Sequence, residues 1–500
     1  MMLLKLLENG AADAPAVVVP GGPRLTYREL REEVLRGAEA LTGLGLRRDQ
    51  AVGMVFGNGA EAIVLFLAAA LAACAAPLNP AYTEAEFRFY LEDLGAAALV
   101  VPPGGAEAAR RALPPGAVLV EAAIAGDGRL RLQADAGGTR ESRRGALEEP
   151  TGADVALMLH TSGTTGRPKR VPLRHRNLAA SVDNIAAHYQ LGPDDVSLCV
   201  MPLFHVHGLM ASALATLRSG GTVVVPAPFN PLSFWSVASG QRPTWYSAVP
   251  TMLRMVLARA RGERPPGSES LRFVRSCSSA LAPELMADIE RRLGAPVLEA
   301  YGMTEACHQI SSNPLPPAER RPGSVGLGTG VQVAVADGGG AALPAGAPGE
   351  VVIRGPNVID GYADNPEANA ESFMDGWFRT GDQGVLDERG YLTLIGRIKE
   401  LINRGGEKIS PLEIDEVLLR HPAVAEAAAF AVPHPTLGEQ VAAAVVLSGP
   451  ATERGLLAHC RERLAAFKVP GRLYVVEAIP RTATGKPQRR RIAKALEAGR

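Results

Sequence analysis

The sequence predicts an α/β protein: a large N-terminal domain of stacked α/β sheets plus a β subdomain, and then a small, mobile α+β C-terminal domain. Three observations lead to this prediction. The length of 500 residues exceeds what one hydrophobic core supports. Residues 25–301 alternate short apolar strands with helical segments, which is typical of a parallel sheet with crossover helices. The pattern then changes twice, to short β-rich runs at 322–395 and to a compact α+β pattern after residue 396.

The alternation in the N-terminal part defines most of the expected elements. Strands are predicted where short apolar runs end at turn residues, and helices where apolar residues recur at helical spacing. The predicted strands are 50–56, 76–79, 97–101, 220–225, 244–249, 271–276 and 297–301, with a strand end at 25–30 and a strand and turn at 197–208. The predicted helices are the run from 30 towards 44, one from Glu61, 83–94, 177–189, 250–261 and one that begins at Pro283. Residues 103–150 indicate short strands and an exposed connection.

The C-terminal part shows its own order of elements. Strands are expected at 401–403, 424–432, 440–447 and 472–476, with a loop at 404–410 and helices at 411–420 and 452–464. We therefore expect two domains, 1–396 and 397–500, with a hinge near Lys399.

Composition and charge exclude several classes of protein. Lys plus Arg and Asp plus Glu both number 52, so no excess of positive charge indicates nucleic-acid binding or a polybasic membrane patch. The five cysteines contain no CxxC pair, which argues against a disulfide framework and a zinc site and favours a reducing cytoplasm. The N-terminus makes a poor signal peptide. The Ala-rich run 60–76 is interrupted by Glu61, so a buried helix is expected rather than a membrane span.

The densest motif is the run TSGTTGRPK between two apolar segments. Such glycines and hydroxyls leave backbone N–H groups and side-chain donors free to surround a polyphosphate. The residues concerned are Thr161, Ser162, Gly163, Thr164, Thr165, Gly166 and Lys169. The run differs from the GxxxxGK[ST] loop because Arg-Pro separates Gly166 from Lys169 and no Ser or Thr follows. A polar surface turn is the alternative interpretation.

Five sequence words occur in order along the chain: HTSGTTGRPKRVPLRH, YGMTEA, TGD at 380–382, GRIKELINRGGEKISP and TATGKPQRR. Together they resemble the adenylate-forming superfamily of acyl-CoA synthetases, NRPS adenylation domains and luciferases. The resemblance covers nearly the whole chain and implies an active site between the two domains. It also implies two half-reactions, in which ATP and a carboxylate give an acyl-adenylate and pyrophosphate, and a thiol then takes the acyl group.

The resemblance assigns roles residue by residue. A carboxylate that approaches a triphosphate needs phosphate donors, a divalent metal and a cation at the α-phosphate. Thr304 is implied at the α-phosphate and Glu305 at a magnesium ion, while Lys486 resembles the lysine that domain closure brings to the acid and the α-phosphate. Asp382 would accept from the ribose hydroxyls, supported by Arg397. The segments implied on the two sides of the adenine are Ser279-Ala280-Leu281 and Glu299-Ala300-Tyr301-Gly302.

Each of these residues also has a structural interpretation. Asp382 is compatible with an Asx-turn, Glu305 with an acid in the first turn of a helix, and Lys486 with a solvated basic tail. Lys399 resembles the hinge residue of the superfamily. Gly405-Gly406 resembles the loop near the pantetheine arm, where side chains would block a narrow tunnel, and this favours CoA as the thiol.

Three polar residues point to the acid. His207 in PLFHVHG, Ser278 after a predicted strand, and His308 after the MTE word would together hold a second carboxylate of a short diacid. His207 is also expected among the catalytic residues. The words RSCSSALAP and YGMTEACHQISSNPLPP resemble the oxalate–CoA ligase branch, whereas malonyl-CoA synthetases usually carry Arg where Ala300 stands. The alternative for His308 is a histidine that bonds only to backbone.

The sequence therefore predicts an ATP-, Mg²⁺- and CoA-dependent acid–CoA ligase for a very short dicarboxylate, with oxalate first. A ligase for another small or medium-chain or malonate-like acid is an alternative of the same class, and a luciferase-like oxygenase is a further activity of this fold. A non-catalytic acyl-adenylate-binding homologue belongs to a different class. It is disfavoured because Lys169, Glu305, Asp382 and Lys486 are all present. An unrelated P-loop ATPase is disfavoured by the lysine spacing.

Overall fold

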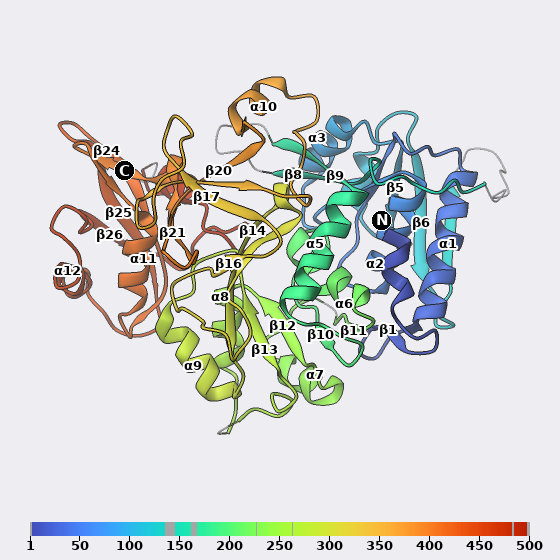
Figure 1. Cartoon of the computed structure of the whole chain (residues 1–500), viewed down its shortest axis with the longest axis horizontal. Coiled ribbons are helices and arrows are strands. Elements are labelled where there is room, and N and C mark those ends of the chain that lie inside the picture. Colours follow the sequence, from blue (N-terminus) through green and yellow to red (C-terminus); the bar gives the residue numbers. More distant parts are fainter. Residues whose placement is uncertain are drawn as a thin grey trace.

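A computed structural model describes residues 3–135, 146–161, 168–226, 228–262, 264–482 and 485–497. It confirms the α/β fold class, with two large mixed sheets in the N-terminal part and two smaller sheets after them (Figure 1). The described residues contain no helix that combines the length and the apolar character needed to cross a membrane.

The first large sheet has seven strands, with parallel pairing in its centre and antiparallel pairing at both edges. Its strands, in spatial order, are β7 (Leu130–Asp135), β6 (Val118–Ile124), β5 (Ala98–Val101), β3 (Ala51–Met54), β4 (Cys74–Pro77), β8 (Val155–Thr161) and β9 (Lys169–Arg174). The second large sheet has nine strands. They are β16 (Leu327–Gly328), β15 (His308–Ser312), β14 (Val297–Met303), β13 (Phe273–Ser276), β12 (Trp245–Ala248), β10 (Val196–Leu198), β11 (Thr222–Val224), β1 (Pro15–Val18) and β2 (Arg24–Thr26).

Helices pack between and around these sheets. α2 contacts β4, β6 and β8 of the first sheet, α6 contacts β11 of the second, and α5 contacts both sheets through β9 and β15. The helical elements of this part are η1 (Leu3–Glu8), α1 (Tyr27–Gly43), α2 (Ala60–Ala72), α3 (Glu84–Leu94), α4 (Glu107–Arg111), α5 (His175–His188), the π-helical η2 (His207–Leu214), α6 (Ala215–Arg218), α7 (Phe234–Gln241), α8 (Pro250–Leu257), α9 (Pro283–Leu293) and η3 (Thr304–Ala306).

Local sequence explains where these helices begin and how they pack. Thr26 and Thr83 form capping boxes with Glu29 and Glu86, so α1 and α3 start where their N–H groups first find partners. Every residue of α2 except Glu61 is buried, which confirms that the Ala-rich run forms a core helix. The apolar sequence of α2 is therefore the consequence of packing between layers.

The two smaller sheets follow in the chain. The third sheet contains β17 (Gln332–Ala336), β18 (Gly349–Arg354), β19 (Phe373–Met374), β20 (Trp377–Leu386) and β21 (Leu392–Arg397), with α10 (Pro366–Ser372) beside it. After η4 (Ile398–Glu400), the fourth sheet contains β22 (Ile402–Arg404), β23 (Glu407–Ile409), β24 (Val424–His434), β25 (Gly438–Leu447) and β26 (Arg472–Val475). Its helices are α11 (Pro411–Leu419), α12 (Glu453–Arg461) and α13 (Arg489–Glu497).

Several sequence expectations need correction. His207 begins a π-helical segment instead of lying on a turn, and the helix expected to reach residue 261 ends at Leu257. β23 lies inside the expected loop 404–410, and the ten-residue β20 was not anticipated. The basic tail is also ordered. Arg489 donates to Asp415 at 2.6 Å and is 8% exposed, so it belongs to a buried ion pair instead of a solvated run.

The pairing of β14 with β15 requires a glycine at position 302. A Cβ atom added there would lie 1.8 Å from the carbonyl oxygen of His308, which is a backbone atom of the paired strand. A register irregularity lies at the same point, between Tyr301 and Gly302. The two strands therefore approach more closely than any side chain at residue 302 permits.

We expect Gly302→Ala to lower the melting temperature and the yield of folded protein, because β15 must move away from β14. Gly126→Ala is the matched control, since a Cβ atom there meets nothing within 4 Å and the residue has no left-handed φ. Thermal unfolding of both variants tests this. Equal melting temperatures for the two variants would contradict the close approach.

Candidate active site

The residues expected at the site gather where strands of the second sheet end. β12, β13 and β14 run parallel, so their carboxyl ends lie on one edge. The segments that follow β13 and β14 carry Ser278 and Thr304. Loops at this edge of a parallel sheet commonly hold ligands because they are free of sheet pairing. The third sheet and the C-terminal segment around Lys486 contribute the remaining residues.

The predicted phosphate loop joins two antiparallel strands. Thr161 ends β8, Lys169 begins β9, and the two residues pair across the hairpin. Ser162, Gly163, Thr164, Thr165 and Gly166 lie outside the described residues. The ammonium group of Lys169 lies 4.5 Å from the ring centroid of Tyr362. The hairpin thus directs its lysine towards the residue that contacts Glu305.

Thr304 and Glu305 lie on the short helix η3, directly after β14. Their exposures are 8% and 6%, and the Tyr362 hydroxyl donates to Glu305 Oε1 at 2.9 Å. The described residues contain no group of three or more metal-ligating side chains. One carboxylate beside a phosphate loop suits Mg²⁺, which usually takes one or two carboxylates and completes its shell with phosphate oxygens and water. Burial and Glu305 both raise the pKa of Tyr362, so its hydroxyl stays protonated and remains a donor.

Asp382 and Arg397 form a fixed pair on neighbouring strands. They are register partners in β20 and β21, and Arg397 Nε lies 2.8 Å from Asp382 Oδ1. The Tyr301 hydroxyl donates to the other carboxylate oxygen. Burial alone would lower the pKa of Arg397, but the charge of Asp382 holds this pKa above its ordinary value. Asp382 lies within a strand, so the Asx-turn interpretation does not describe it.

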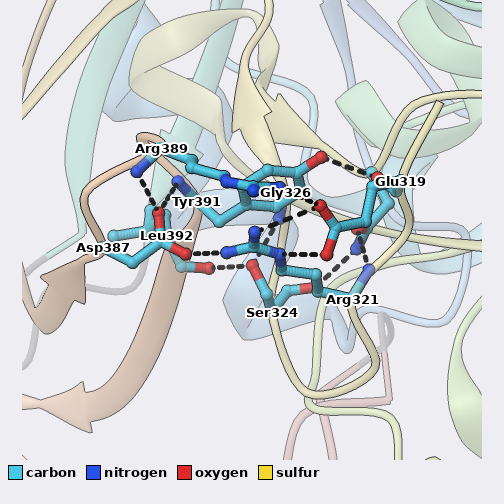
Figure 2. Close-up of polar contacts among 9 residues, drawn as sticks. Glu319, Arg321, Ser324, Gly326, Asp387, Arg389, Tyr391 and Leu392 are labelled. Carbon is cyan, nitrogen blue, oxygen red and sulfur yellow. Dashed lines mark hydrogen bonds and ion pairs between the residues drawn. The ribbon is translucent and has the colours of Figure 1, made fainter.

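A charged cluster fixes the hairpin that carries this pair. Figure 2 shows Arg321 between Glu319 and Asp387, with Tyr391 beside it. The Tyr391 hydroxyl donates to the Glu319 carbonyl oxygen at 2.6 Å, and the Arg321 guanidinium lies 4.1 Å from the Tyr391 ring centroid. Ser324 Oγ also donates to the Leu392 carbonyl oxygen at 2.7 Å. The segment around residues 319–326 therefore anchors the turn between β20 and β21, at whose far ends Asp382 and Arg397 lie.

The two segments expected around the adenine are joined by one hydrogen bond. The backbone N–H of Leu281, next to Ser279-Ala280, donates to Glu299 Oε1 at 3.1 Å. Glu299 is 3% exposed, and its Oε2 has no hydrogen-bond partner among the described residues. Burial raises the pKa of Glu299 to about 8, although the bond from Leu281 acts in the opposite direction. Ala300 and Tyr301 lie beside it on β14, and Gly302 follows.

The structure brings together the three residues expected to bind the acid. His207 Nδ1 lies 3.0 Å from Ser278 Oγ, and the rings of His207 and His308 stack with centroids 4.8 Å apart. His207 and His308 are buried, whereas Ser278 is partly exposed. Burial lowers the pKa of both imidazoles well below the ordinary value, and Arg275 lowers them further. Both histidines are therefore neutral near pH 7.

Four residues of this site were not anticipated: Tyr362, Ser247, Arg275 and Gln309. Arg275 is fully buried and donates to Ser247 Oγ at 2.9 Å and to Gln309 Oε1 at 2.9 Å. One signal was available, because the predicted strand 271–276 reads LRFVRS and so carries Arg275 and Arg272 beside its apolar residues. Charged residues are rarely buried without a specific partner.

Lys486 reaches the site from the C-terminal part. A Cβ atom on the adjacent Gly485 would lie 3.2 Å from Val249 Cγ2, so this turn packs against the end of β12. Lys486 keeps solvent access. Desolvation by the surrounding protein nevertheless lowers the pKa of Lys486, and the charge of Arg397 lowers this pKa further. The charge of Asp382 acts in the opposite direction. The charges of Arg397 and Asp382 thus both act on the Lys486 ammonium group.

The residues expected at the hinge and near CoA lie elsewhere in the fold. Lys399 is exposed on η4, between the third and fourth sheets. Gly405 and Gly406 form the turn between β22 and β23, with φ of 61° and 97°. Both angles are left-handed, which explains why glycines occupy the turn.

Comparisons with known proteins agree with this geometry. The family model described as AMP-binding enzyme matches residues 7–363, and the model described as AMP-binding enzyme C-terminal domain matches residues 413–486. The chain is 45% identical to an oxalate–CoA ligase of Arabidopsis thaliana over 98% of this chain and 97% of that protein. It is 44% identical to an oxalate–CoA ligase of Saccharomyces cerevisiae, covering 97% and 95% of the two chains.

A solved structure also matches along its whole length. ATP-bound MatB from Rhodopseudomonas palustris is 32% identical, covers 99% of both chains and has a TM-score of 0.87. Apo MatB from the same organism has the same identity and coverage but a TM-score of 0.76. Identity and coverage do not differ, so the two scores reflect different conformations, and the present structure is closer to the ATP-bound form.

We expect Glu299 to make stability depend on pH. Its folded-state pKa of about 8 lies above the ordinary value of 4.5, so the folded state holds a proton that the unfolded state has lost. Stability therefore falls as pH rises from 4.5 towards 8, by at most about 1.4 kcal/mol per pH unit. Glu299→Gln removes this cost and keeps the acceptor for Leu281.

Thermal unfolding of the ligand-free protein at pH 6 and pH 8.5 measures this effect. The advantage of Glu299→Gln over the unmodified protein should grow with pH. The exposed Glu388, replaced by Gln, is the control and should show the same small difference at both values. A pH-independent effect of Glu299→Gln would show that residue 299 is ionised in the folded protein.

Proposed function

Because this chain belongs to the AMP-binding enzyme family, we propose that it is an ATP-dependent oxalate–CoA ligase. In the first half-reaction a substrate carboxylate attacks the α-phosphate of ATP, and pyrophosphate leaves. In the second, the thiolate of CoA attacks the acyl carbon of the oxalyl-adenylate, and AMP leaves. The observation that carries the choice of acid is the polar cluster of His207, Ser278 and His308, held by the buried Arg275.

The chemistry of this cluster favours a very short diacid. An alkyl or aryl acid needs an apolar pocket wall, whereas these four residues present hydroxyl, imidazole and guanidinium groups. Oxalate has a carboxylate at each end, so one can react while the other is held by hydrogen-bond donors. The two oxalate–CoA ligases among the relatives support this assignment. Ala300, where malonyl-CoA synthetases usually carry Arg, makes a malonate-like acid the weaker alternative.

The ATP site is proposed from the paired residues. Asp382 accepts from the ribose hydroxyls, Arg397 and Tyr301 fix its carboxylate, and Glu299-Ala300-Tyr301-Gly302 with Ser279-Ala280 flanks the adenine. Thr304 and the hairpin between Thr161 and Lys169 donate to the phosphates. Mg²⁺, held by Glu305 and the phosphates, would neutralise charge on the triphosphate when bound.

Lys486 carries out the adenylation step in this proposal. Its ammonium group attracts both the acid carboxylate and the α-phosphate, which otherwise repel each other. The position of Lys486 near Asp382 and Arg397, and the greater likeness to the ATP-bound MatB structure, support an adenylation conformation. Domains 1–396 and 397–500, with a hinge at Lys399, would then rearrange so that the turn Gly405-Gly406 faces the CoA arm.

The proposed setting of the enzyme is the cytoplasm. All five cysteines are free and buried. Free thiols in this number suit a reducing compartment. A non-catalytic adenylate-binding protein is disfavoured, because such a protein has no need to retain Glu305, Asp382 and Lys486 together, and the charges of Glu305 and Asp382 both act on Lys486.

A pyrophosphate-release panel tests the acid. The purified protein receives ATP, Mg²⁺ and one of oxalate, malonate, succinate, acetate, octanoate or 4-coumarate, with and without CoA. Oxalate should give the highest kcat/KM, and thioester should form only with CoA. A higher value for octanoate or 4-coumarate would reject the diacid, and no turnover with any acid would favour the binding-protein alternative.

We expect Lys486→Ala to abolish adenylation, by about a hundredfold or more if it removes one strong electrostatic contact at the transferring group. Thioester formation from supplied oxalyl-adenylate should be largely spared. Single-turnover assays of each half-reaction measure the two effects, and Lys494→Ala, a lysine of α13, is the control. Equal loss of both half-reactions in Lys486→Ala would contradict the assigned role.

A further inference from the structure

Arg275 is a fully buried cation whose hydrogen bonds all go to neutral groups. Its exposure is 0%, and no carboxylate lies within ion-pair distance of it among the described residues. Its Nε donates to the Tyr189 hydroxyl at 2.8 Å, and its other nitrogens donate to Ser247 and Gln309. A buried charge without a counter-ion is costly. Such a cost persists where the charge serves a function, and here an anion would relieve it.

The contact between Arg275 and His308 fixes the proton on the imidazole. Arg275 Nη2 donates to His308 Nε2 at 3.0 Å. A guanidinium has donors only, so Nε2 must accept, and the neutral ring carries its proton on Nδ1. Arg275 therefore makes His308 Nδ1 a hydrogen-bond donor.

The same argument applies to His207 through Ser247. Arg275 Nη1 donates to Ser247 Oγ at 2.9 Å and lies 3.4 Å from His207 Nε2. Ser247 Oγ lies 2.6 Å from that Nε2, so the serine hydroxyl donates to it. His207 is then protonated on Nδ1 and donates to Ser278 Oγ at 3.0 Å. The hydroxyl hydrogen of Ser278 is left to donate to a further acceptor, on the partly exposed side of the cluster.

The backbone provides a second, independent observation. Ser278 and His308 have φ of 75° and 97°, and Cys307 between η3 and β15 has φ of 49°. Non-glycine residues seldom adopt left-handed conformations, and where they do the strain commonly marks functional positioning. Two of the three residues that contact the acid in the proposed function are held in this way.

We propose that Arg275 is a positioning residue of the acid site, which fixes His207 and His308 as Nδ1–H donors and supplies the positive charge that compensates the second carboxylate of the substrate. This inference rests on the proposed diacid substrate. Oxalate is a dianion, so the neutral histidines alone bring no charge to its non-reacting end. The charge of Arg275 acts through His308 Nδ1–H and, by way of His207, through the Ser278 hydroxyl, and these two groups donate towards the carboxylate.

Two variants test the role, with a matched arginine as control. Arg275→Gln removes the charge, and we expect it to raise the KM for oxalate about tenfold or more, as loss of a charge-assisted contact does. The KM for ATP should stay within about twofold, on the ground that the ATP residues do not contact Arg275. Arg275→Lys keeps the charge without the planar fork and should fall in between. Arg272→Gln removes an ion pair with Asp195 just before the same strand and should leave both KM values unchanged.

The tautomers give a readout that does not need a substrate. In ¹⁵N-histidine NMR spectra, the signals of His207 and His308 are those that disappear in His207→Asn and His308→Asn. In the unmodified protein, their ¹⁵N chemical shifts should be those of neutral rings protonated on Nδ1. In Arg275→Gln these signals should change towards the Nε2–H tautomer or the protonated ring. The groups facing the two rings are Arg275 from β13, His205 before η2, and Lys486 from the C-terminal part.

The pH profile should change with the charge. Without Arg275 the pKa of both imidazoles rises, so Arg275→Gln should regain oxalate kcat/KM as pH falls from 8 to 6, whereas the unmodified protein should not. If Arg275→Gln lowers only the melting temperature and leaves tautomers and oxalate KM unchanged, Arg275 is a structural residue and the inference is wrong. If the unmodified protein does not turn over oxalate but its histidines show the expected tautomers, the diacid assignment fails and the tautomer network stands.

Discussion

The close pairing of β14 with β15 at Gly302 is the constraint on which the rest of the site depends. Within ten residues, from Glu299 to His308, this hairpin carries the proposed adenine segment, the phosphate and metal residues and one wall of the acid pocket. The His308 carbonyl lies so close to Gly302 that the proposed adenine segment and the proposed acid pocket are held at a fixed separation. The left-handed φ of Cys307 and His308 turns the chain back within three residues of Glu305. A change in one subsite therefore displaces the other.

Charge is distributed unequally between the two ends of this site. At the ribose end, Asp382 and Arg397 compensate each other before any ligand arrives, so this pair can preserve its geometry. At the acid end, Arg275 has only neutral partners among the described residues, and Lys486 has a lowered pKa because desolvation and Arg397 both disfavour its charge. In the proposed function, binding of the triphosphate and of a dianionic acid would offset both costs, so that substrate charge would stabilise the assembled site.

The sequence was sufficient for features that depend on local patterns. The Ala-rich run of α2 indicated a buried helix, and the alternation of strands and helices predicted stacked α/β sheets. The spacing of His207, Ser278 and His308 along the chain gave no distances, but their residue types suggested a common pocket, and the structure brings them within hydrogen-bonding and stacking distance. The π-helical start at His207 could not be predicted because a π-turn depends on packing around Gly208, where a Cβ atom would lie 2.4 Å from the Pro202 carbonyl oxygen.

Residues whose role depends on tertiary contacts were missed for the same reason. Arg275 shares its predicted strand with Arg272, and only the structure shows that Arg272 pairs with Asp195 whereas no carboxylate among the described residues pairs with Arg275. Tyr362 resembles any aromatic residue near a turn until its hydroxyl is seen on Glu305. The sequence of α13 is compatible with a solvated basic run, because the ion pair of Arg489 with Asp415 joins residues 74 positions apart and leaves no local pattern. Sequence patterns report which residues face a core, whereas buried polar partners are set by the fold as a whole.

The contacts that hold the C-terminal part against the site are suited to a reversible arrangement. Arg420 and Glu284 form an ion pair across the junction, with side chains 41% and 60% exposed, and such pairs contribute about 0–1 kcal/mol. Gly485 packs against Val249, and burial is the main cause of the raised pKa values of Glu416 and Glu299. The exposed ion pair attracts only weakly, and the buried acids do not strengthen it. Ligands can therefore shift the equilibrium between the conformations of the C-terminal part. In the proposed adenylation step, contacts of Lys486 with the acid carboxylate and the α-phosphate would favour the closed form, and release of those contacts would let the proposed hinge at Lys399 alternate.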